Sequence, residues 1–110
     1  MSESEFLALA EAVLDRIEAG LEQAGEEADV DVECSRSGNV LQVEFFDNGS
    51  KIIVNTQAPM QEIWVAARAG GFHYRLQDAQ WRNTRDGSEL FAALAELASA
   101  QAGAPLKLKA

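Results

Sequence analysis

The 110-residue sequence contains one cysteine, one histidine and no long apolar run, and each shortage excludes a class of protein. A single cysteine rules out an internal disulfide and any thiolate cluster that would hold zinc or an iron–sulfur centre. A single histidine, His73, argues against a closed transition-metal site. No apolar stretch approaches the roughly 20 residues of a transmembrane helix. The start, Met-Ser-Glu-Ser-Glu, lacks the basic and apolar regions of a signal peptide. We therefore expect a cytoplasmic protein that does not enter a membrane.

Basic residues are scarce in the first part of the chain. Positions 1–47 hold 13 acids and two bases, a net charge of −11, whereas positions 48–110 hold five acids and seven bases, a net charge of +2. An acidic half of this kind repels nucleic acid and anionic membranes, and it attracts metal cations or a basic protein surface. Nucleic-acid binding is therefore not expected.

Most of the acids lie in one stretch, which we call the acidic ridge. Its members are Glu11, Asp15, Glu18, Glu22, Glu26, Glu27, Asp29, Asp31 and Glu33. The first four are spaced 4, 3 and 4, so they form one stripe of a helix. The last three alternate with apolar residues, which predicts that they point to one side of a strand. Because like-charge neighbours on a helix cost roughly 0.2–0.5 kcal/mol per pair, we interpret the ridge as a site for something cationic. A solvated charged face is the alternative that the pattern leaves open.

Apolar spacings of 3 and 4 predict a first helix, opened by a capping box between Ser2 and Glu5 and ended near Ala24 by a C′ glycine, Gly25. Period-2 patterns then predict strands over 30–36, 40–46, 51–55, 61–68 and 72–76, with a short sixth strand around Trp81. The expected turns are Ser37-Gly38-Asn39, Asp47-Asn48-Gly49 as a type I′ hairpin, and Gly70-Gly71.

A second helix is expected after Asp86-Gly-Ser-Glu89, which has capping-box spacing, and Gly103 and Pro105 end it. Leu106-Lys107-Leu108-Lys109 alternates and is expected to lie extended in a groove. The order helix, five to six antiparallel strands, helix predicts an α+β fold: a two-layer α/β sandwich with both terminal helices packed on one face of the sheet. Residues 1–110 then form a single domain, and the other sheet face stays open.

The open face is predicted to carry Trp64. In the strand over 61–68, the aliphatic set Ile63, Val65 and Ala67 suits the helix side, which leaves Trp64 outward. Exposed aromatic residues are enriched at binding hot spots, although a buried structural role for Trp64 remains an alternative. The same alternation points four further residues outward: Asn55, Gln57, His73 and Arg75. It points four others inward: Phe72, Tyr74, Leu76 and Trp81.

No catalytic constellation is evident. Asp29-x-Asp31-x-Glu33 opens like a calcium-binding EF-hand loop but lacks the glycine at its sixth position and the glutamate at its twelfth. Cys34 shares a face with two valines and is expected to be a small buried hydrophobe, which leaves a Cys–His pair unsupported. The ridge offers oxygen donors suited to several weakly held hard or borderline cations, such as iron or calcium.

Taken together, the residues resemble the frataxin family, most closely its bacterial branch. The resemblance is carried by Ser4-Glu5-Phe6, Leu9-Ala10, Ile17-Glu18, the acidic strand 29–33, Asn48-Gly-Ser-Lys-Ile-Ile-Val-Asn55, Gln57, Pro59, Ile63-Trp64-Val65-Ala66, Gly70-Gly71-Phe72-His73-Tyr74, Trp81 and Asp86-x-Ser88. It implies the same sandwich and a frataxin-like domain over 1–110. The chain departs from close relatives at Gln23 and Gly25, where acids are common, and at Leu7, where some members have histidine.

The resemblance also implies a function. Iron would bind with modest affinity to surface carboxylates, with candidates Glu18, Glu22, Glu26, Glu27, Asp29, Asp31 and Glu33. The protein would act in iron–sulfur cluster assembly by docking on the cysteine desulfurase and its scaffold protein, as iron donor and/or regulator. The partner-binding candidates are Glu11, Asp15, Asn55, Gln57, Trp64 and His73. It would be mainly a monomer, with iron-driven oligomers left open.

Two other functions are kept as alternatives. One is an acidic interaction module whose metal binding is incidental. The other is a weak ferroxidase or iron-storage protein, against which the lack of a Glu-x-x-His di-iron pattern speaks. We therefore expect a protein that is not an enzyme. Haem at His73, Tyr74 or Cys34 also remains open.

Overall fold

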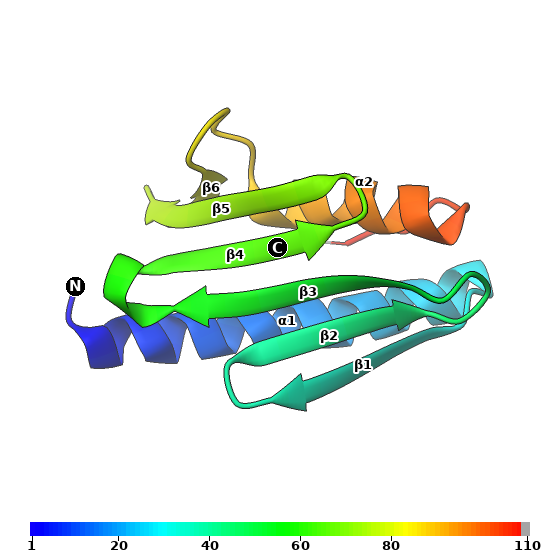
Figure 1. Cartoon of the computed structure of the whole chain (residues 1–110), viewed down its shortest axis with the longest axis horizontal. Coiled ribbons are helices and arrows are strands. Elements are labelled where there is room, and N and C mark those ends of the chain that lie inside the picture. Colours follow the sequence, from blue (N-terminus) through cyan, green and yellow to red (C-terminus); the bar gives the residue numbers. More distant parts are fainter. Residues whose placement is uncertain (109–110) are drawn as a thin grey trace.

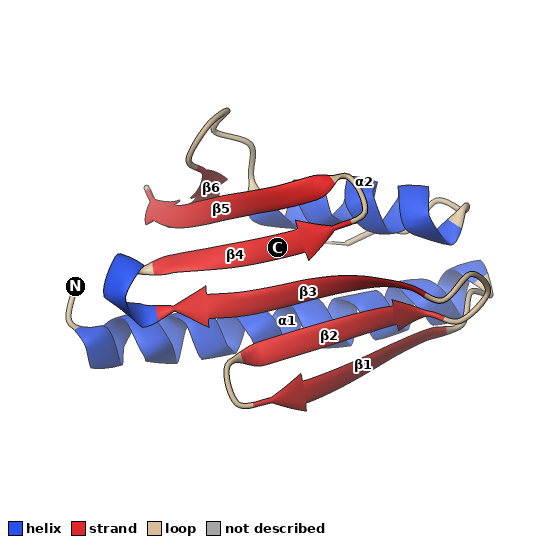
Figure 2. Cartoon of the chain, viewed as in Figure 1, coloured by secondary structure: helices blue, strands red, loops and turns tan. Residues whose placement is uncertain are grey.

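The computed structural model describes residues 1–108, which form two helices and a six-stranded sheet (Figures 1 and 2). The elements are α1 (Glu3–Ala28), β1 (Val32–Ser37), β2 (Val40–Phe45), β3 (Ser50–Gln57), the 3₁₀ turn η1 (Ala58–Met60), β4 (Glu62–Ala67), β5 (Gly70–Gln77), β6 (Gln80–Asn83) and α2 (Leu90–Ala102). The strands lie in sequence order, β1-β2-β3-β4-β5-β6, and every neighbouring pair is antiparallel. Both helices lie behind the sheet in Figure 1, so the predicted sandwich is confirmed. Among the described residues, no helix is both long and apolar enough to cross a membrane.

Helix α1 begins as predicted but ends later. The side chain of Ser2 accepts a hydrogen bond from Glu5 N at 3.1 Å, and Glu5 Oε1 accepts one from Ser2 N, which completes the capping box. The expected end at Gly25 is wrong, because the helix continues to Ala28 and Asp29 caps it in the left-handed conformation, with φ 56°. Gly25 is instead needed inside the helix, since a Cβ there would lie 2.9 Å from the carbonyl oxygen of Val30.

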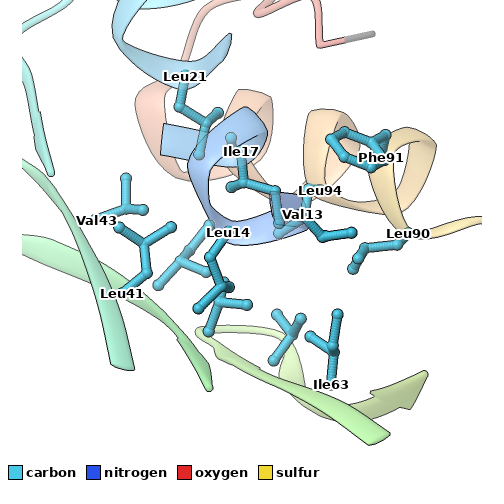
Figure 3. Packing of buried hydrophobic residues seen from close by; sticks show 14 of the residues in the cluster. Val13, Leu14, Ile17, Leu21, Leu41, Val43, Ile63, Leu90, Phe91 and Leu94 are labelled. Carbon is cyan, nitrogen blue, oxygen red and sulfur yellow. The ribbon is translucent and has the colours of Figure 1, made fainter. Parts of the chain in front are cut away.

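One core fills the space between the two layers (Figure 3). Helix α1 contributes a continuous buried stripe: Phe6, Ala10, Val13, Leu14, Ile17, Leu21 and Ala24. The sheet contributes Leu41, Val43, Phe45, Ile52, Val54, Ile63, Val65, Tyr74 and Trp81. Helix α2 contributes Leu90, Phe91, Leu94 and Ala98. The rings of Phe6 and Trp81 meet edge to face with centroids 5.9 Å apart. The first turn of α1 is therefore anchored to β6, an edge strand of the sheet.

Three of the predicted turns and caps differ in detail. The β2–β3 connection spans four residues, 46–49, and only Gly49 has a positive φ, 71°, so the type I′ prediction was wrong. The Asn48 side chain accepts a hydrogen bond from Ser50 N at 2.9 Å, and its Nδ2 donates to Gln101 O at 2.6 Å. The predicted turn at Gly70-Gly71 falls two residues earlier, and both glycines belong to β5.

The start of α2 also differs from the prediction. Glu89 is the N-cap and accepts hydrogen bonds from Phe91 N and Ala92 N, whereas Asp86 bonds to Ser88 in the preceding loop. Gly103 ends the helix as predicted, with φ 69°. In the tail, Leu106 is buried and Leu108 packs against the core, while Lys109 lies outside the described residues.

Candidate functional site

The helical part of the acidic ridge is joined to the sheet by a base that its own stretch does not contain. Arg36 on β1 donates from Nη1 to Asp15 Oδ1 at 2.8 Å, and the same nitrogen lies 3.5 Å from Glu18 Oε1. The hydrogen bond to Asp15 raises the pKa of Arg36. Arg16, the one base within the stretch 11–33, lies instead over the ring of Phe91, 5.4 Å from its centroid. Asp15 and Glu18 are therefore partly neutralised.

A group of acids that form no ion pair among residues 1–108 lies at the end of α1. Four exposed carboxylates line one hollow of about 550 Å³, together with Gly25, Val30 and Val32: these are Glu22, Glu26, Asp29 and Asp31. We call these four residues the acidic hollow. The backbone holds its shape, since Val30 N donates to Gly25 O at 2.8 Å and Phe46 N donates to Asp31 O at 3.1 Å.

The helix itself adds to the negative potential of the acidic hollow. The C-terminal end of a helix carries a partial negative charge on its last carbonyl groups. Helices usually place a base there, but the last turn of α1 has none. Four carboxylates at that end reinforce the helix dipole where opposite charges would offset it. This is an unfavourable arrangement for stability alone, and a cation placed in the hollow relieves it.

The geometry of the hollow is that of an open surface. Across residues 1–108, no group of three or more His, Cys, Asp or Glu side chains is arranged closely enough to hold a metal ion. Hard cations can be coordinated by water molecules together with a few carboxylate oxygens. The arrangement therefore suits a hydrated cation, exchanging among neighbouring carboxylates, better than a closed metal centre.

Three predicted metal candidates lie apart from the acidic hollow. Glu18 lies beside Arg36. Glu27 lines a different depression, beside Pro105 and Lys107. Glu33 lies on β1 opposite Glu44 of β2. The strand stripe expected for Asp29, Asp31 and Glu33 was wrong, because Asp29 caps the helix and β1 begins only at Val32.

The open face brings together the predicted partner-binding residues of the sheet. Asn55, Trp64 and His73 lie directly opposite one another across β3, β4 and β5. The indole of Trp64 stacks on the His73 ring at 4.4 Å between centroids and 8° between planes. Gln57 joins this group through a 2.7 Å hydrogen bond from its Nε2 to Asn55 Oδ1. Glu11, the remaining candidate, lines a separate hollow near Leu7 and Arg36.

Comparisons with known proteins address the family. A model described as a frataxin-like domain matches residues 1–104. The chain belongs to the frataxin family. The protein named iron-sulfur cluster assembly protein CyaY from Janthinobacterium sp. (strain Marseille) is 65% identical over 109 residues, covering 99% of this chain and 97% of the relative.

Solved structures place this frataxin in the same bacterial branch. Frataxin from Psychromonas ingrahamii, described as a member of the CyaY protein family, superposes with a TM-score of 0.85 at 30% identity, covering 100% of both chains. A trimeric yeast frataxin complexed with ferrous iron has a TM-score of 0.73 at 26% identity, covering 86% of this chain and 85% of the yeast chain. This chain is accordingly a CyaY-type frataxin.

One residue of this frataxin's open face was missed by the sequence analysis. Glu62 points to the solvent side of the sheet yet is only 4% exposed. Its carboxylate accepts hydrogen bonds from Trp64 Nε1 and Arg75 Nε, both at 2.8 Å, and lies 3.5 Å from His73 Nδ1. The alternation of β4 could have revealed it, since a residue two before Trp64 shares its face.

The three haem candidates of this frataxin do not converge. Cys34 faces α1, with its thiol 3.9 Å from Glu18 O, and burial raises its pKa to about 12, with nearby Glu22, Glu18 and Glu33 adding to the effect. Tyr74 is buried on the helix side of the sheet, and burial raises its pKa as well. His73 lies on the opposite face, against Trp64.

Proposed function

We propose that this chain is an accessory protein of iron–sulfur cluster assembly, acting without enzymatic turnover as one frataxin-like domain. It binds iron weakly at the acidic hollow and docks on the cysteine desulfurase and its scaffold protein, as iron donor and/or regulator. Support comes from the names of its relatives and from the ferrous complex of the yeast frataxin. The observation that carries the proposal is the clustering of four exposed carboxylates at the base-free end of α1.

Weak binding follows from the chemistry of the acidic hollow. Carboxylate oxygens are hard donors that suit Fe²⁺ and Fe³⁺ more than soft cations. An exposed group of carboxylates leaves most of the coordination shell to water, so the bound ion exchanges readily. An iron donor needs this property, because the ion must pass to a partner. Haem is not part of the proposal, because Cys34 and Tyr74 face the helices whereas His73 lies on the open face.

Docking uses the charge of the ridge and the side chains of the open face. The acidic residues of α1 and β1 suit a basic surface on the desulfurase, and electrostatic attraction of this kind speeds association. The stacked pair Trp64–His73, with Asn55 and Gln57 beside it, offers an aromatic and amide platform for a second contact. The free protein is a monomer in this proposal, and iron-driven oligomers are tested by the same titration.

The test is an anaerobic Fe(II) titration followed by NMR amide shifts and by sedimentation. We expect shifts and broadening over residues 22–31 and little change on β5 and β6. A hollow variant, Glu22→Gln, Glu26→Gln, Asp29→Asn and Asp31→Asn, loses this response. A control variant changes the same number of charges at residues that are not iron candidates: Glu3→Gln, Glu11→Gln, Asp78→Asn and Glu96→Gln. If both variants respond equally, the hollow is not the iron site.

The second candidate is an acidic docking module. It is favoured by the lack of a closed metal group among residues 1–108. The two functions differ in how iron affects affinity for the desulfurase. If iron binding matters, affinity measured with Fe(II) differs from affinity measured with a chelator, and the hollow variant removes the difference. If the affinity for the desulfurase is the same with Fe(II) and with a chelator, the protein is an acidic docking module. A ferroxidase would instead show saturable oxygen consumption that the hollow variant lacks.

A further inference from the structure

The edge of the sheet opposite the acidic ridge carries a pair of arginines. Arg75 on β5 and Arg82 on β6 lie directly opposite each other, so both side chains share the open face. In Figure 1 the strands β5 and β6 lie at the edge farthest from β1. Like charges directly opposite in a sheet are destabilising, so the pair is an unfavourable arrangement unless something anionic occupies the space between them.

Arg75 is held in place by Glu62, which lies directly opposite it on β4. The Glu62 side chain is 5% exposed, whereas that of Arg75 is 58% exposed, and the contact is made by Arg75 Nε to Glu62 Oε2 at 2.8 Å. A guanidinium has five N–H donors, and this contact uses one. Within residues 1–108, Arg75 makes no other side-chain hydrogen bond. Its terminal nitrogens are therefore oriented by a buried carboxylate and remain available at the surface.

Arg82 is fixed without being neutralised. Its Nη1 donates to Gly87 O at 2.9 Å and its Nη2 bonds to Gln80 Oε1. In the described part of the chain, no carboxylate lies within ion-pair distance of Arg82. Only Arg75 of the two guanidinium groups is paired with a carboxylate, which leaves a net positive site on a chain whose net charge is −9.

We propose that Glu62, Arg75 and Arg82, which we call the arginine corner, bind a carboxylate-bearing segment of a protein partner beside the Trp64–His73 stack. This rests on the proposed function, since the partner is then part of the cluster-assembly machinery. The partner would present an acidic segment to the arginine corner and a basic surface to the acidic ridge. An arginine fork binds a carboxylate through two parallel hydrogen bonds. Glu62 acts as a positioning residue for that fork. Nucleic acid is disfavoured as the occupant, because the acidic half of the chain repels it.

The test uses a hexaglutamate peptide titrated into the full chain at low salt and followed by NMR. We expect shifts of the side-chain N–H resonances of Arg75 and Arg82 and of Trp64 Nε1–H. Arg75→Gln and Arg82→Gln together weaken the peptide affinity at least fivefold. Arg75→Lys keeps the charge but loses the fork, and it weakens the affinity at least twofold. The control pair Arg68→Gln and Lys51→Gln removes the same charge elsewhere and leaves the affinity unchanged.

Three outcomes overturn the proposal: no peptide response, an equal loss in the control pair, or equally tight binding of a thymidine hexanucleotide. The Fe(II) titration separates this proposal from the function of the ridge. The Arg75→Gln/Arg82→Gln variant keeps its Fe(II) response over residues 22–31. The hollow variant keeps its hexaglutamate response. Failure of one site therefore leaves the other measurable.

Discussion

The indole Nε1 of Trp64 donates a 2.8 Å hydrogen bond to the carboxylate of Glu62, on the face of the sheet that no helix covers. The bond ties an aromatic side chain to a carboxylate that is almost fully buried. Stacking on His73 covers one face of the indole. Trp64 is therefore a fixed part of the surface, and its replacement affects Glu62 as well as any partner.

Replacing Trp64 tests this dependence. Trp64→Leu removes a hydrogen bond to a charged, buried acceptor, and we expect it to lower the free energy of unfolding by about 1–3 kcal/mol. Trp64→Arg supplies a new N–H donor to Glu62, so the fold persists while binding to the desulfurase falls. Urea denaturation and a desulfurase affinity measurement check both variants. Loss of the folded state in Trp64→Arg would show that the tryptophan is structural core.

Two glycines of α1 should respond in opposite ways to the same substitution. A methyl group at Gly25 meets the carbonyl oxygen of Val30 and the side chain of Val32 at 2.9–3.2 Å. We expect Gly25→Ala to cost about 1–3 kcal/mol through overpacking, despite the better helix propensity of alanine. At Gly20 the neighbour is the flexible end of Leu108. Gly20→Ala is the matched control and should be neutral, or stabilising by up to about 1 kcal/mol. Thermal unfolding of both variants tests this difference. Equal destabilisation would contradict the conclusion that close packing requires glycine at position 25 and not at position 20.

Neutralising the acids that follow α1 should leave the fold equally or more stable. The change is Asp29→Asn, Asp31→Asn and Glu33→Gln. Asparagine tolerates the left-handed conformation of position 29, with φ 56°, and each relieved like-charge pair contributes about 0.2–0.5 kcal/mol. The gain should shrink in 1 M salt, where screening weakens repulsion. A control with Glu3→Gln, Asp78→Asn and Glu96→Gln should gain less. A clear drop in melting temperature would contradict the repulsion argument.

The thiol of Cys34 should be unreactive near neutral pH. Burial raises its pKa from 9.0 to about 12, so the folded chain holds the thiol proton more tightly than the unfolded chain does. The stability from this group is therefore complete below pH 9 and is lost as the pH rises from 9 towards 12. The raised pKa of Tyr74 acts in the same direction at high pH.

Two measurements check the behaviour of Cys34. Iodoacetamide should modify the folded chain at pH 8 at least tenfold more slowly than the urea-unfolded chain, because the thiolate is the reactive form. The free energy of unfolding, measured with urea, should fall less steeply between pH 8 and pH 11 for Cys34→Ala than for the parent chain. A folded chain that reacts as fast as free cysteine would refute the burial argument.

Local spacing in the sequence was enough for the layers, the strand order and the outward direction of Trp64. Periodicity reports which face of an element a residue occupies, and these features depend on little else. What it missed depends on contacts distant in the chain. Arg36 joins the ridge only because β1 lies beside α1. Glu62 pairs with Arg75 because the register places the two residues opposite each other. Gly25 was predicted to end the helix because glycine occurs at helix ends as well as at tightly packed positions inside a helix.

The strict sequence order of the strands also bears on how the chain reaches this structure. Each strand pairs with its immediate predecessor, so the sheet can grow hairpin by hairpin through short loop closures. The apolar stripe of α1 leaves the ribosome before the strands and the second helix, α2, that cover it. Until then Phe6 and its neighbours are exposed without the partner Trp81. The synthesis of β6 and α2 is therefore the step at which α1 is finally protected from aggregation.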